Sequence, residues 1–452
     1  MKHKKIQALI NCGIILLLTA SLALFLSCKK DEPNNSTKSN YKAELISGNN
    51  QKGFINQKLD SSINIIVKDV KNKRYKDAII SINSNNGSFY HGYDYQNGEY
   101  LIHWLTNCNT ELRSATIIVK DSSGILIDTL EVSCFVEKDS LWNRACGIPV
   151  TVLHHEFAFP SIQKIEKAPN GTLFIATYNF HESIYASYDN GETWEEYLNL
   201  EPYSRVHDLT INSIGTIFLS TDKGLYKKKL NDSWRKVTDE IMYKCFSIDK
   251  NTLFAYNNLH RKIYRSDDEG ETWNIISIPY VNNNGSLSYT EAINKVTRID
   301  ENKILLLNSD KKLLISCDNG VNWGIFNNTA FFEVTGFYIL NDNIYLANVS
   351  GSKSIPSIFK SDLQGTTWSL FCTLTRRPSS YYPVSEMNSY NENLFVLTDN
   401  CIYQIDKSGD TLNITNDVWE KIDVIQLFNI SSNGNIIIGA TVRDNSVFYM
   451  NL

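Results

Sequence analysis

Apolar and polar side chains alternate along residues 41–137, in short runs that are separated by turns. A period of two residues is typical of strands with one buried face, and Asn-Gly or Ser-Gly pairs mark the turns between such runs. The segment therefore predicts a β-sandwich built from short strands. The predicted strands include residues 62–67, 78–82, 98–104, 115–119 and 128–132.

A second pattern begins near residue 160 and continues to the C-terminus. An apolar strand follows a turn, as in Gly171–Ala176 and Gly215–Ser220, and the copies lie about 44 residues apart on average. A period of this size is typical of a four-stranded propeller blade, so the chain is predicted to be all-β. The first aliphatic residues of the seven copies are Leu173, Ile217, Leu253, Ile304, Ile344, Leu394 and Ile436.

Four of the copies continue into a tight turn that ends in tryptophan. In such a turn glycine supplies a positive φ, aspartate accepts bonds from loop N–H groups, and the indole folds back onto the sheet. These residues are predicted to be structural, and the fourth copy has Leu363 in place of its aspartate. The predicted hairpin residues are Ser187, Asp189, Gly191, Thr193, Trp194, Ser266, Asp268, Gly270, Thr272, Trp273, Ser316, Asp318, Gly320, Trp323, Ser361, Gly365, Thr367 and Trp368.

The four turns resemble the S-x-D-x-G-x-T-W Asp box, or BNR repeat, of sialidase-like and sortilin-like propellers. The resemblance implies an Asp-box β-propeller over residues 148–452. Seven copies favour seven blades, with six or eight as the alternatives. In the last copy, residues 424–430, 435–441 and 446–452 supply three strands, which leaves an edge that must be paired. We expect Pro149–Glu156 to provide the fourth strand and close the ring.

The N-terminus reads as a secretory signal. A basic start is followed by an apolar run from about Ala8 to Leu26, then by Ser27 and Cys28. The alternative is a membrane-spanning helix. The Leu24–Cys28 segment resembles the lipobox of bacterial lipoproteins, which implies that Cys28 is lipidated. The Cys-Lys-Lys-Asp-Glu start is similar to surface-exposed outer-membrane lipoproteins of the Bacteroidetes. Residues 29–40 are polar and are predicted to form a flexible tether.

The sandwich segment also carries a family resemblance. Val67-Lys68-Asp69 and Val119-Lys120-Asp121 are similar to the V-x-D elements of bacterial immunoglobulin-like repeats of the invasin type. The resemblance implies an immunoglobulin-like domain over residues 41–137 that acts as a spacer or adhesive module. It implies no chemistry.

Charge and cysteine content narrow the function classes. The net charge of -5 argues against nucleic acid as a partner, because phosphate binding needs a strongly basic surface. Seven cysteines follow Cys28, and no Cys-x-x-Cys pair occurs, so no zinc site is indicated. A bridge between Cys108 and Cys134 is compatible with the sequence, and buried free thiols are the alternative. No metal or cofactor is expected.

The search for catalytic motifs favours a protein that is not an enzyme. Nucleophile-elbow, P-loop, dinucleotide and zinc-protease signatures are absent from the sequence. His154-His155-Glu156 lies in the predicted closing strand, where adjacent side chains face opposite ways. Sialidases place an Arg-Ile-Pro element before the first Asp box, and Phe157–Ile162 holds no arginine there. A pair of carboxylates in the centre of the ring would instead favour glycoside hydrolysis.

Aromatic and basic residues gather on the loops opposite the predicted Asp-box turns, where propellers usually bind ligands. We therefore predict a lipid-anchored binding protein whose partner is a glycan or a protein. The alternatives are a divergent exo-glycosidase and an envelope assembly factor. The candidate ligand-face residues are Tyr203, Arg205, Tyr280, Tyr289, Arg376, Arg377, Tyr381 and Tyr382.

Overall fold

The computed structural model describes most of the chain from residue 39 onward, so the leader, Cys28 and most of the tether lie outside it. The described residues form strands and turns without a helix, which confirms the all-β prediction. Among them no helix could cross a membrane. The described ranges are 39–84, 87–91, 97–139, 142–153, 156–178, 183–199, 205–229, 232–257, 259–281, 286–326, 329, 333–348, 356–374, 384–398, 401–414, 424–431, 433–441 and 446–450.

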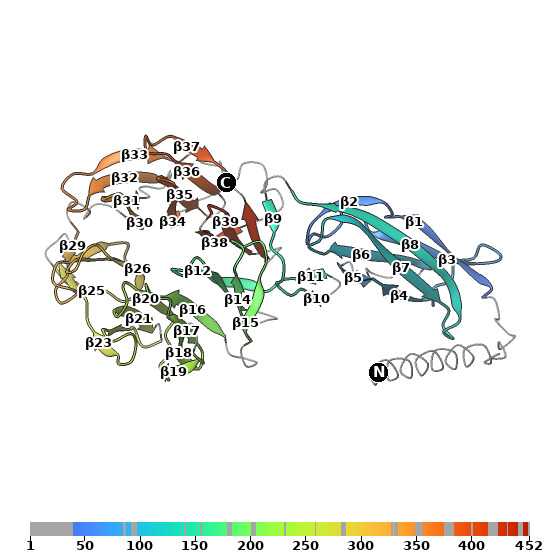
Figure 1. Cartoon of the computed structure of the whole chain (residues 1–452), viewed down its shortest axis with the longest axis horizontal. Helices are drawn as coiled ribbons and strands as arrows, with labels where there is room; N and C mark the ends of the chain where they lie inside the picture. Colours follow the sequence, from blue (N-terminus) through green and yellow to red (C-terminus); the bar gives the residue numbers. More distant parts are fainter. Residues whose placement is uncertain are drawn as a thin grey trace, which may run out of the picture.

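Two four-stranded sheets form the predicted sandwich, at the right of Figure 1. Their inward residues share one apolar cluster, in which Ile65 and Trp104 of one sheet pack with Ile117 and Val132 of the other. The first sheet has the order β1 (Tyr41–Ser47), β3 (Ile63–Asp69), β6 (Glu99–Thr106) and β5 (Gly87–His91). The second has the order β2 (Gln51–Phe54), β8 (Leu126–Glu137), β7 (Glu111–Lys120) and β4 (Ile79–Asn83).

Seven four-stranded antiparallel sheets follow in the described part of the chain. The strands of each sheet are named in the order in which they lie side by side. The first three sheets are β12 (Ser161–Lys167) with β13 (Leu173–Tyr178), β14 (Ser183–Ser187) and β15 (Glu195–Asn199); β16 (Val206–Ile211) with β17 (Ile217–Thr221), β18 (Gly224–Lys228) and β19 (Arg235–Thr238); and β20 (Lys244–Ser247) with β21 (Leu253–Asn257), β22 (Lys262–Ser266) and β23 (Asn274–Ile276).

The remaining sheets repeat this order. They are β26 (Ile293–Arg298) with β27 (Ile304–Asn308), β28 (Leu313–Ser316) and β29 (Gly324–Ile325); β30 (Val334–Leu340) with β31 (Asn343–Asn348), β32 (Ser357–Asp362) and β33 (Ser369–Thr373); β34 (Val384–Tyr390) with β35 (Asn393–Thr398), β36 (Cys401–Ile405) and β37 (Thr411–Asn413); and β38 (Val424–Ile430) with β39 (Ile436–Thr441), β40 (Ser446–Met450) and β9 (Trp142–Arg144). A two-stranded hairpin of β24 (Pro279–Val281) and β25 (Leu287–Tyr289) precedes β26.

The seven sheets are arranged in a circle. Consecutive sheets contact each other near their first strands, and β38 of the last sheet contacts β12 of the first (Figure 1). Apolar side chains fill the space between neighbours. Phe174 and Ala176 of the first sheet, for example, pack with Leu209 and Leu219 of the second. A closed ring of four-stranded sheets with their first strands around its axis is a β-propeller.

The strand that closes the ring is not the predicted one. Trp142–Arg144 (β9) pairs with β40, and the Ala145 N–H continues the ladder to the carbonyl of Val447 at 2.8 Å. Part of the expected segment forms a separate hairpin instead, with β10 (Thr151–Leu153) pairing β11 (Glu156–Ala158). The prediction was wrong because Cys146 already bonds the first hairpin, through the Glu192 carbonyl, so the chain leaves the last sheet before residue 149.

The bridge between Cys108 and Cys134 that the sequence left open does not form. Cys108 is bonded to Cys146, with 5.9 Å between their Cα atoms, and this bridge ties the sandwich to the ring. Cys134 is a buried free thiol, since its side chain points into the sandwich core. The same junction holds a hydrogen bond of 2.7 Å from the Asn56 Nδ2 to the carbonyl of Ala145.

Candidate functional site

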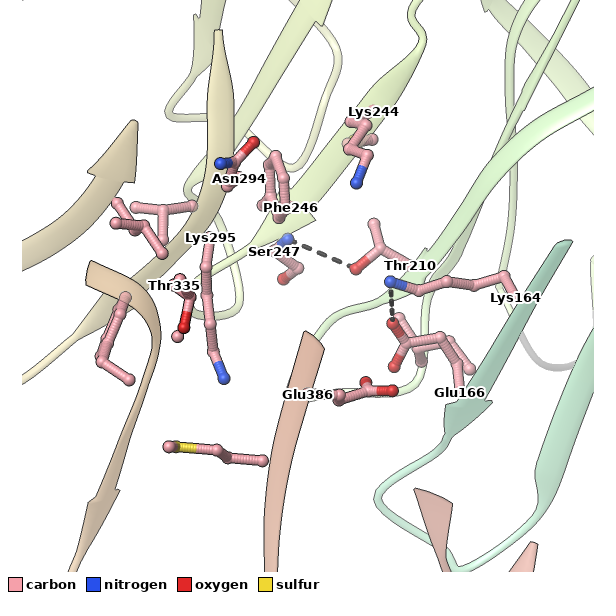
Figure 2. A pocket seen from close by; sticks show the side chains of 17 residues that line it. Lys164, Glu166, Thr210, Lys244, Phe246, Ser247, Asn294, Lys295, Thr335 and Glu386 are labelled. Atoms are coloured by element: carbon pink, nitrogen blue, oxygen red, sulfur yellow. Dashed lines mark hydrogen bonds and ion pairs between the residues drawn. The ribbon is translucent and has the colours of Figure 1, made fainter. Parts of the chain in front are cut away.

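A cavity of about 490 Å³ lies on the axis of the ring and is lined by the first strands of six sheets. Its size is within the range of sites for small ligands. Figure 2 shows the polar side chains that line it, which come from β12, β16, β20, β26, β30 and β34. The strands that build the propeller therefore also position this site.

Five charged residues occupy one equivalent position in these strands. Each pairs with the residue three places after the first aliphatic residue of its repeat, as Lys164 does with Ala176. In four of the five strands a register shift directly precedes this position. The five residues are Lys164, Asp208, Lys244, Lys295 and Glu386.

Carboxylates dominate one side of the cavity. The Lys164 ammonium lies 3.3 Å from the Glu166 carboxylate and 3.7 Å from that of Asp208. Burial lowers the pKa of Lys164, but the carboxylates of Asp208 and Glu166 outweigh burial and raise it overall. Burial raises the pKa of Glu166, and Lys164 offsets part of that rise. Glu386 adds a further negative charge on this side.

Lysines dominate the other side. The Lys295 ammonium lies 5.4 Å from the ring centroid of Phe337 and 5.3 Å from that of Tyr338. Burial lowers the pKa of Lys295. Within the described residues its ammonium has no hydrogen bond or ion pair, and the nearby Thr335 hydroxyl is buried without a hydrogen-bond partner. Lys244 adds a second positive charge at the exposed edge.

The four predicted Gly-Trp hairpins lie at the outer strands, away from the cavity. In the first, Ser187 Oγ donates to Asp189 at 2.9 Å and the Thr193 N–H donates to the same carboxylate at 2.9 Å. The Trp194 indole N–H donates to the Gly191 carbonyl at 3.1 Å. The second and third hairpins repeat this network around Asp268 and Asp318.

The fourth hairpin keeps its carboxylate, although Leu363 stands where an aspartate was expected. Asp362 accepts a bond of 3.0 Å from the Thr366 N–H and one of 2.7 Å from the Thr366 hydroxyl. Ser361 Oγ instead donates to the Thr367 carbonyl at 2.6 Å. The network has therefore moved one residue toward the N-terminus, so Thr367 does not have the role that the sequence suggested.

We expect Asp268→Asn to destabilise the protein by about 1 kcal/mol at pH 7, since exposed hydrogen bonds to a carboxylate contribute modestly. Desolvation raises the pKa of Asp268, but bonds from Thr272 and Ser266 outweigh it and lower the pKa to about 2. This stabilisation is present above the unfolded pKa of about 4 and is lost as the pH falls from about 4 to about 2. Urea unfolding of both proteins across this range would measure the difference, and Asp232→Asn is the control. A difference that stays constant down to pH 2 contradicts the assignment.

Three of the predicted ligand-face residues are described, and of these Tyr280 and Tyr289 lie on the paired strands β24 and β25. Arg205 lies over the Tyr178 ring at 5.5 Å, and Tyr289 is exposed on β25. Tyr280 was predicted wrongly, because its ring is buried and its hydroxyl donates to Asp310 at 2.8 Å. The other ligand-face residues lie outside the described residues: Tyr203, Arg376, Arg377, Tyr381 and Tyr382. His154 and His155 lie outside them too.

Within the described residues no group of three or more His, Cys, Asp or Glu side chains is placed to hold a metal ion. The cavity instead offers ammonium, carboxylate, hydroxyl and amide groups on a rigid wall. Such a set can orient a polar ligand through hydrogen bonds and ion pairs.

Comparisons with known proteins concern the fold. No protein-family model and no curated protein matches the chain. Among solved structures, YCF48 bound to D1 peptide is 12% identical and covers 70% of this chain and 98% of its own, with a TM-score of 0.48. YCF48 from Cyanidioschyzon merolae is 9% identical, covers 69% and 99%, and also has a TM-score of 0.48. The β-propeller domain of the Trilobed protease from Pyrococcus furiosus is 9% identical and covers 83% and 99%, with a TM-score of 0.38.

Proposed function

We propose that this chain is a lipid-anchored binding protein of the cell envelope, held at Cys28 and displayed on the outer membrane. In this proposal, residues 41–137 are an immunoglobulin-like spacer, and the seven sheets are the blades of an Asp-box propeller. The propeller binds a polar ligand, a glycan or a segment of protein, in the central cavity. The anchor, the tether and the two family resemblances rest on the sequence.

The observation that carries the binding role is the set of charged side chains on the axis of the ring. A propeller needs apolar contacts between its sheets, and it gains little from lysines and carboxylates in a half-enclosed cavity. Lys295 in particular is half-buried without a close ion pair among the described residues, and the charges of Glu386 and Glu166 offset only part of the effect of burial on its pKa. Groups of this kind gather at functional sites more often than elsewhere.

One observation favours glycoside hydrolysis as a second candidate. Glu166 and Glu386 line the same cavity, and burial raises the pKa of Glu166, as a general acid requires. The lysine beside Glu166 works against this reading, because it stabilises the ionised form of the carboxylate. We therefore place binding first.

The test compares full-length protein in detergent with Lys295→Met on glycan and peptide arrays. We expect the wild type to retain a ligand that Lys295→Met binds at least tenfold more weakly, a change of about 1.4 kcal/mol. Lys52→Met, in the sandwich, is the matched control. If Lys295→Met and Lys52→Met retain the ligand equally, the ligand does not bind in the cavity. Glycoside turnover that is lost in Glu166→Gln would instead favour the hydrolase.

A further inference from the structure

The charges that line the cavity are segregated. Strands β12 and β34 contribute the carboxylates of Glu166 and Glu386 to the lining, and Asp208 of β16 lies behind them beside the single ammonium of Lys164. Strands β20 and β26 contribute the lysines Lys244 and Lys295, and no described lining residue of β20, β26 or β30 is acidic. The cavity therefore has an excess of negative charge on one side and of positive charge on the other.

The order of the sheets places these two sides opposite each other. The acidic strands belong to the first, second and sixth sheets, which adjoin through the seventh, whereas the lysines belong to the third and fourth. Figure 2 shows the Lys295 side chain reaching into the cavity from the side opposite Glu166, with Glu386 facing it. A ligand on the axis would meet both sides at once.

On the acidic side a lysine forms ion pairs with the carboxylates, whereas the Lys295 ammonium on the basic side has no ion pair among the described residues. Lys164 neutralises part of the charge of Glu166 and Asp208. In the described part of the chain, Lys295 has no such close ion pair, although the charges of Glu386 and Glu166 offset part of the lowering of its pKa by burial. Leaving a half-buried ammonium without an ion pair costs free energy, which an anionic group beside it would recover.

We propose that the cavity binds a zwitterionic amino-carboxylate of amino-acid to short-peptide size. Its carboxylate lies at Lys295, and its ammonium lies at Glu386 and Glu166. This inference rests on the proposed binding function and specifies the ligand group that enters the cavity. A neutral glycan would leave Lys295 unpaired, and a purely anionic ligand would meet the carboxylates on the far side.

The test is calorimetric titration of the full-length protein in detergent with free dipeptides. Each dipeptide is paired with its C-terminal amide, which lacks the carboxylate, and with its N-acetyl form, which lacks the ammonium. We expect each modification to weaken binding at least tenfold. Lys295→Met is expected to lower the affinity for the free dipeptide to that for the amide, and to leave the affinity for the amide unchanged. Glu386→Gln has the corresponding effect on the ammonium end, and Lys52→Met has none.

Several results would overturn the inference. One is a panel of dipeptides and amino acids that gives no binding, and another is equal affinity for the free, amidated and acetylated forms. These comparisons use the wild-type protein, so they remain decisive even where a cavity variant folds poorly. If a glycan or protein ligand needs Lys295 for binding and no dipeptide binds, the proposed zwitterionic ligand is contradicted, but the proposed binding function is not. Ligands that do not depend on the cavity would overturn both.

Discussion

Trp142→Ala is expected to lower the free energy of unfolding by about 3–5 kcal/mol, the range for removal of a large buried aromatic side chain. Trp142 lies on the strand that completes the last sheet, opposite Met450. Its ring is only 3% exposed and packs in a cluster with Phe448 and Phe395. The substitution thus leaves a void and weakens the strand that closes the ring.

Urea unfolding monitored by far-ultraviolet circular dichroism would measure the loss, and it avoids the change in fluorescence caused by removing a tryptophan. Leu412→Ala is the control, because Leu412 is 60% exposed on the edge strand of the neighbouring sheet. A loss below about 1 kcal/mol for Trp142→Ala would show that β9 does not stabilise the ring, since buried aromatic truncations cost more.

Most of the fold could be predicted from local pattern, because each repeat carries its own strand and turn signals. The expected strands at Leu173, Ile217 and Leu253 begin β13, β17 and β21. The closing strand could not be found in this way. Val150–Leu153 has a stronger apolar pattern than Trp142–Arg144, but the pairing is decided by which segment reaches the free edge of β40. That choice is a long-range one, and single-sequence patterns do not contain it.

The candidate site was missed for a different reason. Catalytic motifs and loop residues gave no sign of it, because the cavity is built from residues that are scattered over six separate repeats. A signal was present in the spacing. Counting back nine residues from the first aliphatic residue of the first four repeats gives Lys164, Asp208, Lys244 and Lys295. Charges at a fixed place in otherwise apolar repeats indicate a shared polar axis, although their grouping into two sides needs the ring order.

The junction of the two domains supports the second large expected effect. Cys108→Ser is expected to destabilise the protein by about 4 kcal/mol under oxidising conditions, because the bridge closes a long loop in the unfolded chain. The two cysteines are 38 residues apart, and the loop contains β7, β8 and the ring-closing β9. Loss of the bridge therefore weakens both the sandwich and the closure of the ring. Urea unfolding in the absence of reductant measures the change.

A comparison of single and double variants distinguishes this bridge from the Cys108–Cys134 pairing that the sequence left open. If Cys108 is bonded to Cys146, Cys146→Ser should destabilise the protein about as much as Cys108→Ser, and the variant with both replaced should lose no more than either, because one bond is lost in each case. Cys317→Ser, at an exposed free thiol, is the control for the change of sulfur to oxygen. Peptide mapping without reductant gives a direct answer. A peptide containing Cys108 linked to one containing Cys134 would contradict the structure, because that bond would lie within the sandwich.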